Sequence, residues 1–73
     1  MNGSRHSDLE LAERHVVEAE VRIARQQQLI DRMERDKHPE VAARARAILV
    51  TFNATLELMR EHLELLRSTS TQA

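Results

Sequence analysis

Asp36-Lys37-His38-Pro39 is the stretch that decides the fold, because it separates two long segments that both have helical periodicity. Proline has no backbone N–H and a fixed φ, so it is tolerated in the first turn of a helix but not in its interior. It also disfavours helical geometry at the residue before it, here His38. The stretch therefore predicts that one helix ends near Asp36 and that a second helix begins at Pro39.

A link this short places the two predicted helices side by side and antiparallel. Glu40, in the first turn of the second helix, suits the positive end of the helix dipole. We therefore predict an all-α fold, a coiled-coil-like antiparallel hairpin. Its first helix is expected over residues 8–36, its turn at 37–38 and its second helix over 39–67.

Both predicted helices carry a nearly unbroken series of apolar residues at alternating spacings of three and four, the a and d positions of four consecutive heptads. On the first helix the series is Leu9, Ala12, Val16, Ala19, Ile23, Gln26, Ile30 and Met33. On the second helix it is Ala42, Ala45, Leu49, Phe52, Leu56, Met59, Leu63 and Leu66. We call these residues the seam.

Closing the turn at 37–38 brings the two series together, with small residues facing large ones in several layers. The register pairs Leu9 with Leu66 and Ile23 with Phe52. The predicted hairpin core consists of the larger apolar members of the seam: Leu9, Val16, Ile23, Ile30, Met33, Leu49, Phe52, Leu56, Met59, Leu63 and Leu66.

The e positions, which follow each d position, support this pairing because they face one another in an antiparallel pair. They are Glu13, Glu20, Gln27 and Glu34 on the first helix, and Arg46, Asn53, Arg60 and Arg67 on the second. Each exposed acid–base pair contributes only about 0.2–1 kcal/mol, so its value lies in specifying direction and partner. The same complementarity can operate between two chains.

Gln26 is the one polar residue of the seam. Two interpretations stand: a buried amide that fixes register or oligomeric state, or a long side chain that reaches solvent.

The two ends of the hairpin are predicted from capping signals. Ser7 and Glu10 fit a capping box, so the first helix is expected to start at Asp8 and residues 1–7 to be flexible. The charge of Arg67 suits a helix C-terminus. The small polar residues 68–73 are expected to be disordered.

Length and composition predict that the hairpin needs a partner. The chain has 73 residues, of which 32% are charged and 1% aromatic, with no Cys to form a disulfide. A hairpin of this size buries a thin core, and oligomerisation is a common remedy. Apolar residues also remain outside the seam; Leu29 and Ile48, at g positions beside it, widen the core.

Further apolar residues form a second stripe on each helix, and they are the predicted oligomer interface: Val17, Val21, Ala24, Ala47, Val50, Ala54 and Leu58. We predict a homodimeric four-helix bundle. The alternatives are a monomer with scattered exposed aliphatic residues and a complex with an unidentified protein partner. The expected function is a non-enzymatic module for protein–protein interaction or oligomerisation.

Charge is unevenly distributed although the net charge is only −1. Residues 22–46 contain seven cations and four anions, whereas the remainder contains four cations and eight anions. The basic turn end suggests an alternative function, a small nucleic-acid-binding accessory protein. Its possible polyanion contacts are Arg22, Arg25, Arg32, Arg35, Arg44 and Arg46. Interspersed acids and the lack of an aromatic residue for base stacking argue against it.

The sequence predicts no catalytic residue, cofactor or metal. His15 and His62 are expected near the open end of the hairpin, but neither belongs to an H-x-x-x-H or E-x-x-H motif. No apolar run approaches the length of about 20 residues that spans a bilayer. The absence of cysteine fits a cytoplasmic location.

Part of the pattern resembles a group of short, uncharacterised bacterial helical-hairpin proteins over about residues 14–67. The residues that carry the resemblance are His15, Val16, Glu18, Glu20, Arg22, Ile23, Arg25, Gln26, Leu29, Ile30, His38, Leu49, Phe52, Leu56, His62 and Leu66. The resemblance implies a cytoplasmic bacterial protein and no known activity. That group often has Gly before the turn His, where this chain has Lys37.

Overall fold

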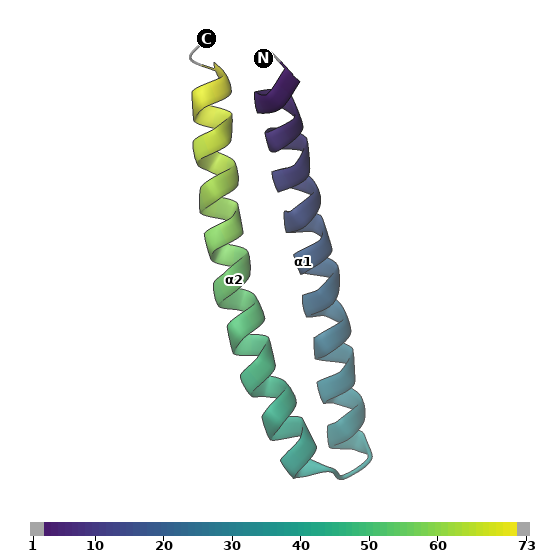
Figure 1. The fold of residues 1–73 in the computed structure, drawn as a ribbon. Helices are drawn as coiled ribbons and strands as arrows, with labels where there is room; N and C mark the ends of the chain where they lie inside the picture. The colour runs from purple at the N-terminus through teal and green to yellow at the C-terminus, as the bar shows by residue number, and fades with distance from the viewer. Residues whose placement is uncertain (1–2, 72–73) are drawn as a thin grey trace.

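The computed structural model describes residues 3–71, with side chains for residues 7–69. It contains helix α1 (Gly3–Arg35) and helix α2 (Pro39–Thr71). Figure 1 shows the two helices side by side, with both termini at the end opposite the turn. The molecule is a narrow rod of 54 × 15 × 15 Å. The predicted all-α antiparallel hairpin is confirmed.

The turn is closed by two backbone hydrogen bonds that end α1. The Lys37 N–H donates to the Glu34 carbonyl at 3.2 Å, and the His38 N–H donates to the Met33 carbonyl at 2.8 Å. Together they form a Schellman motif, in which the residue after the helix adopts a left-handed conformation. Lys37 takes that position with φ of 60°. The chain therefore reverses without the glycine that helix ends usually employ.

Helix α2 begins at the predicted proline. Pro39 occupies the first helical position, where its missing N–H breaks no intrahelical bond. The first bond of the helix runs from the Ala42 N–H to the His38 carbonyl at 3.0 Å. Glu40 lies in the first turn, where the helix dipole favours an anion.

Helix α1 starts earlier than predicted. It begins at Gly3 rather than Asp8, so Ser7 lies inside the helix and the expected capping box does not mark its start. The predicted start of the helix is therefore wrong, whereas the flexibility of residues 1–7 stays a prediction, and residues 1–2 lie outside the described residues. After its first residue this segment contains no proline or glycine, so continuing the helix costs little per residue.

Helix α2 ends later than predicted, at Thr71 rather than near Arg67. The prediction of a disordered tail is therefore wrong for residues 68–71, and residues 72–73 lie outside the described residues. The Thr69 Oγ1 donates to the Leu65 carbonyl at 2.8 Å, which satisfies its hydroxyl inside the helix.

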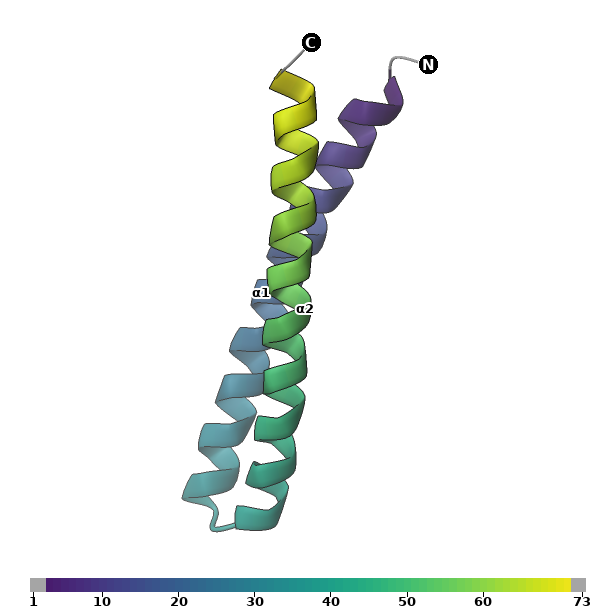
Figure 2. The same cartoon turned by 90° about the vertical axis from the view of Figure 1, so that its left-hand side faces the viewer.

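The seam forms the interior of the hairpin. Figure 2 shows the two helices crossing one another at a slant. Among residues 7–69, the buried and half-buried side chains are those of the seam, and the others are exposed. One buried cluster lies toward the open end and contains Ala12, Val16, Ala19, Leu56 and Leu63. Ile30, Ala42 and Ala45 are buried toward the turn.

Candidate interaction surfaces

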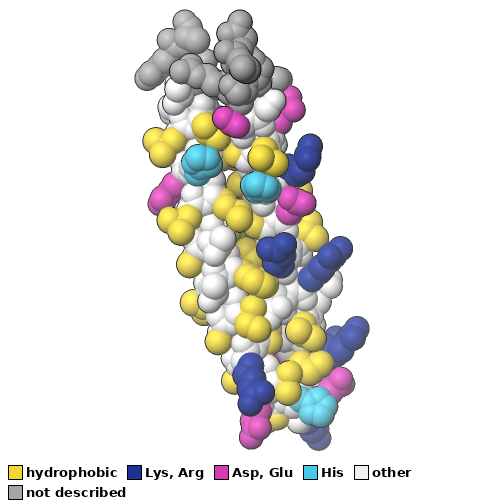
Figure 3. All heavy atoms as spheres, viewed as in Figure 1, with side chains coloured by type: hydrophobic (Ala, Val, Ile, Leu, Met, Phe, Trp, Pro, Cys, Tyr) yellow, Lys and Arg dark blue, Asp and Glu magenta, His cyan; other side chains and the backbone are white. Residues whose placement is uncertain are grey.

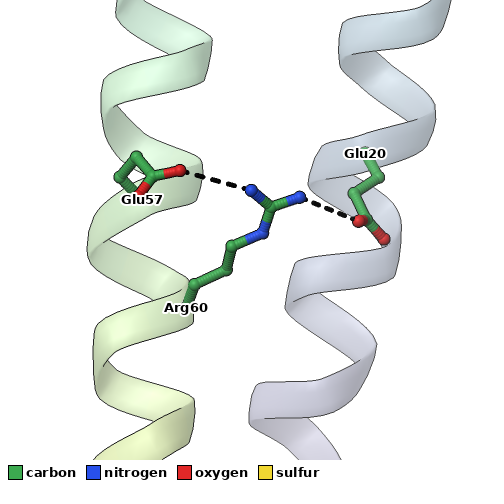
Figure 4. Close-up of polar contacts among 3 residues, drawn as sticks. All are labelled: Glu20, Glu57 and Arg60. Atoms are coloured by element: carbon green, nitrogen blue, oxygen red, sulfur yellow. Dashed lines mark hydrogen bonds and ion pairs between the residues drawn. The ribbon is translucent and has the colours of Figure 1, made fainter.

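One edge of the seam is closed by ion pairs between predicted e positions. They are Glu13–Arg67 at 3.6 Å, Glu20–Arg60 at 3.1 Å, and Glu34–Arg46. Figure 4 shows Arg60 held between Glu20 of α1 and Glu57 of its own helix. We call this side the ion-paired edge. Its side chains are about half exposed, so each pair adds at most about 1 kcal/mol and serves mainly to set the register.

Gln26 connects the helices in the middle of the seam. Its side chain is half-buried, and its Nε2 donates to the Ala45 carbonyl at 2.9 Å. The amide therefore bridges α1 and α2 instead of reaching solvent. This contact favours the interpretation in which the glutamine fixes the register of the two helices.

The opposite edge, which we call the open edge, is lined by the g positions that precede each a position. They are Asp8, His15, Arg22 and Leu29 on α1, and Val41, Ile48, Thr55 and His62 on α2. Among residues 7–69, no ion pair joins the helices along this edge. Leu29, Val41 and Ile48 are 40%, 46% and 47% exposed. The open edge is thus partly apolar and lacks the charged closure of the other side.

The c positions border the open edge on its outer sides. They are Leu11, Glu18, Arg25 and Arg32 on α1, and Arg44, Thr51, Leu58 and Leu65 on α2. Figure 3 shows this side of the molecule, with hydrophobic side chains along the seam and most of the Lys and Arg side chains toward the turn. All three bordering leucines, Leu11, Leu58 and Leu65, are among the exposed large hydrophobic residues.

Seam atoms can be reached from the open edge. A shallow hollow there is lined by the g residues Arg22 and Thr55 together with the seam residues Ala19, Phe52 and Met59. The Arg22 guanidinium lies 5.9 Å from the centroid of the Phe52 ring, a cation–π contact. An arginine side chain therefore covers the only aromatic ring of the chain, which is itself only half-buried.

His15 and His62 come together as the register predicts, since both line one hollow at the open end. Asp8, Leu11, Ala12 and Leu66 line the same hollow. Within the described part of the chain, no three His, Asp or Glu side chains are grouped so that they can hold a metal ion.

The predicted polyanion contacts separate into two kinds. Arg46 is paired with Glu34, and Arg22 lies over Phe52. The other members have no ion-pair partner among residues 7–69: Arg25, Arg32, Arg35 and Arg44. The turn half thus presents four arginines free to meet an anionic group.

The residues of the predicted oligomer interface are exposed, and they lie on the outer sides of the two helices. Val17, Val21 and Ala24 lie at b and f positions of α1, pointing away from the seam. The residues of α2 also lie outside the seam, at b, c and f positions: Ala47, Val50, Ala54 and Leu58. Only Leu58 borders the open edge. Leu29 and Ile48 lie beside the seam as their g positions predict. Val41 lies there too, and its g position was the signal that could have identified it.

Comparison with models of protein families, with curated proteins and with solved structures gives no match. The resemblance to short bacterial hairpin proteins therefore stays a prediction. Neither helix, over its described residues, contains a stretch long and apolar enough to cross a membrane.

Proposed function

We propose that the chain is a non-enzymatic protein–protein interaction module that associates with a second copy of itself, forming a four-helix bundle. The observation that carries this proposal is the surface area of the hairpin. A compact monomer of 8.4 kDa exposes about 4,600 Å², whereas this chain exposes 5869 Å². This excess follows from the rod shape of the hairpin, and it is surface that a second copy can cover.

The exposed hydrophobic side chains support the same proposal. Among residues 7–69, nine large hydrophobic side chains are at least 40% exposed. Among the described residues, no side chain of the seam is both large and completely buried. A core this thin is marginal for an isolated domain, and a second hairpin supplies the missing contacts.

The exposure of the acidic and histidine side chains also supports a binding role. The described Asp, Glu and His side chains lie at exposed positions, whereas catalysis requires convergent polar groups in a partly desolvated site. The absence of cysteine supports a cytoplasmic location.

Thermal unfolding over a range of concentrations tests the proposal. If folding is coupled to association, the Tm rises as the chain concentration increases from micromolar to hundreds of micromolar. A Tm that does not change over this range contradicts self-association.

Nucleic-acid binding is the second candidate, and the unpaired arginines Arg25, Arg32, Arg35 and Arg44 favour it. Each phosphate neutralised adds about −0.9 to the slope of log affinity against log salt on duplex DNA. A generic duplex titrated at several salt concentrations tests it. A steep negative slope that becomes shallower in an Arg32→Gln/Arg44→Gln variant establishes this role, and absence of binding at low salt excludes it.

A further inference from the structure

We infer that the second copy covers the open edge in antiparallel orientation, with the turn end of each hairpin beside the open end of the other. This inference rests on the proposed self-association. It adds the face that becomes buried, the direction of the partner and the residues that meet.

The open edge is the side that a second copy can cover at low cost. On the ion-paired edge, the e positions of α1 present acids and those of α2 present bases. Two such edges packed with α1 against α1 place acid against acid and desolvate paired charges. The open edge instead has exposed apolar side chains near the turn (Leu29, Val41 and Ile48). The c positions that border it add exposed leucines near the termini (Leu11, Leu58 and Leu65).

The order of side chains along α1 gives the direction, because it is self-complementary about residue 20. Asp8 and Arg32 lie twelve residues on either side of this centre, Leu11 and Leu29 nine residues, and Glu18 and Arg22 two residues. All six are either g residues of the open edge or c residues that border it. An antiparallel α1–α1 contact centred there therefore sets acid against base and leucine against leucine, with His15 beside Arg25.

Parallel packing lacks this match. It brings the arginines of the two turn halves together, including the unpaired Arg25, Arg32 and Arg44, and like charges that face one another are unfavourable. In the antiparallel arrangement the two basic turn halves lie at opposite ends of the bundle.

The area is sufficient for such a contact. A standard protein–protein interface buries about 800 Å² on each partner, which is a small part of the 5869 Å² that the hairpin exposes.

Cysteine cross-linking tests face and direction together, since the chain contains no cysteine of its own. Thr55, a g residue, is the middle residue of α2 (Pro39–Thr71) and falls at the level of residue 20 of α1 in the seam register. An antiparallel two-fold axis therefore brings the two Thr55 positions together. A disulfide requires Cα atoms within about 7 Å. We expect Thr55→Cys to form a disulfide-linked dimer on mild oxidation and Val41→Cys, near the turn, not to do so.

The outcomes separate this inference from the proposed function. If the wild-type chain self-associates but Thr55→Cys does not cross-link, the open-edge arrangement is wrong and the proposed function stands. If a mixture of Ile48→Cys and Leu29→Cys chains cross-links efficiently instead, the copies are parallel. If the wild-type chain does not self-associate, the proposed function itself fails.

Charge exchange gives a second test that needs no oxidation. Asp8→Arg places an arginine beside Arg32 of the second copy, and we expect the dissociation constant to rise severalfold. Adding Arg32→Asp to the same chain restores opposite charges at both sites, and we expect the affinity to return to within about twofold of wild type. Failure of the exchange to restore affinity overturns the predicted pairing.

Discussion

The two edges of the seam are built from the same heptad pattern but serve different purposes. The ion-paired edge joins α1 and α2 through Glu13–Arg67, Glu20–Arg60 and Glu34–Arg46. The open edge has apolar residues at three of its eight positions (Leu29, Val41 and Ile48), and it has no such pairs among residues 7–69. The contrast teaches that the charges that set the direction of a hairpin can all lie on one side of its seam, and we propose that the other side binds a partner.

The two edges also differ in the free energy that each can contribute. Exposed ion pairs contribute up to about 1 kcal/mol each, and salt weakens them. Covering the exposed parts of Leu29, Val41 and Ile48 contributes on the order of 1 kcal/mol for each side chain. In the proposed dimer, the ion-paired edge therefore supplies specificity within each hairpin, and the open edge supplies most of the free energy of association.

Among the variants that compare the two edges, Phe52→Ala is expected to lower the free energy of unfolding most. The ring is half-buried in one hairpin, but a partner on the open edge makes it a core residue, whose loss costs about 3–5 kcal/mol. A ring that stays half exposed contributes only about 1.5–2 kcal/mol. Urea unfolding above and below the dissociation constant measures both values, with Val50→Ala as the exposed control. A loss below about 1 kcal/mol at high concentration would mean that Phe52 faces water.

Ile48→Glu and Val50→Glu compare the open edge with the outer stripe of α2. The residues are two positions apart and 47% and 70% exposed. We expect Ile48→Glu to raise the dissociation constant at least tenfold, about 1.4 kcal/mol, because it buries a carboxylate in the interface. Val50→Glu should change it less than twofold. If Val50→Glu weakens association more, the outer stripe is the interface.

Lys37→Gly changes the stability of the hairpin without altering either edge. A non-glycine residue in the left-handed conformation costs about 1 kcal/mol, and Lys37 has φ of 60°. We expect the variant to be more stable by about that amount, measured by denaturant unfolding. Lys37→Ala serves as the control and should not be stabilised. Equal stability of the Gly and Ala variants would rule out the left-handed turn.

The Glu20–Arg60 pair is expected to give the smallest effect. A double-mutant cycle with Glu20→Gln and Arg60→Gln should yield a coupling energy of about 0.2–1 kcal/mol, because both side chains are about half exposed. The coupling should fall in high salt. Glu57, which contacts Arg60 on its own helix, provides the comparison pair at 3.2 Å. A coupling above about 2 kcal/mol would give the ion-paired edge more weight than we assign to it.

The sequence predicted the hairpin and its register because the signals were redundant. Pro39 marked the reversal, the seam gave the facing stripes, and the e positions agreed with both. The helix ends were missed because Ser7 resembled a cap and the polar residues after Arg67 resembled a tail, although neither segment contains a strong helix breaker.

The interaction surface was harder to predict. Apolar residues outside the seam were visible in the sequence, but assigning them to one face required the orientation of both helices. The cation–π contact of Arg22 with Phe52 and the accessible seam atoms of the open edge are features of packed side chains. The amino-acid sequence alone does not indicate such side-chain contacts.

Sedimentation equilibrium at micromolar and higher concentrations tests the central claim most directly. We predict a species of about twice the chain mass of 8.4 kDa for the wild-type protein, and the single-chain mass for Ile48→Glu under the same conditions. A wild-type chain that sediments as a single 8.4 kDa species throughout would contradict the account.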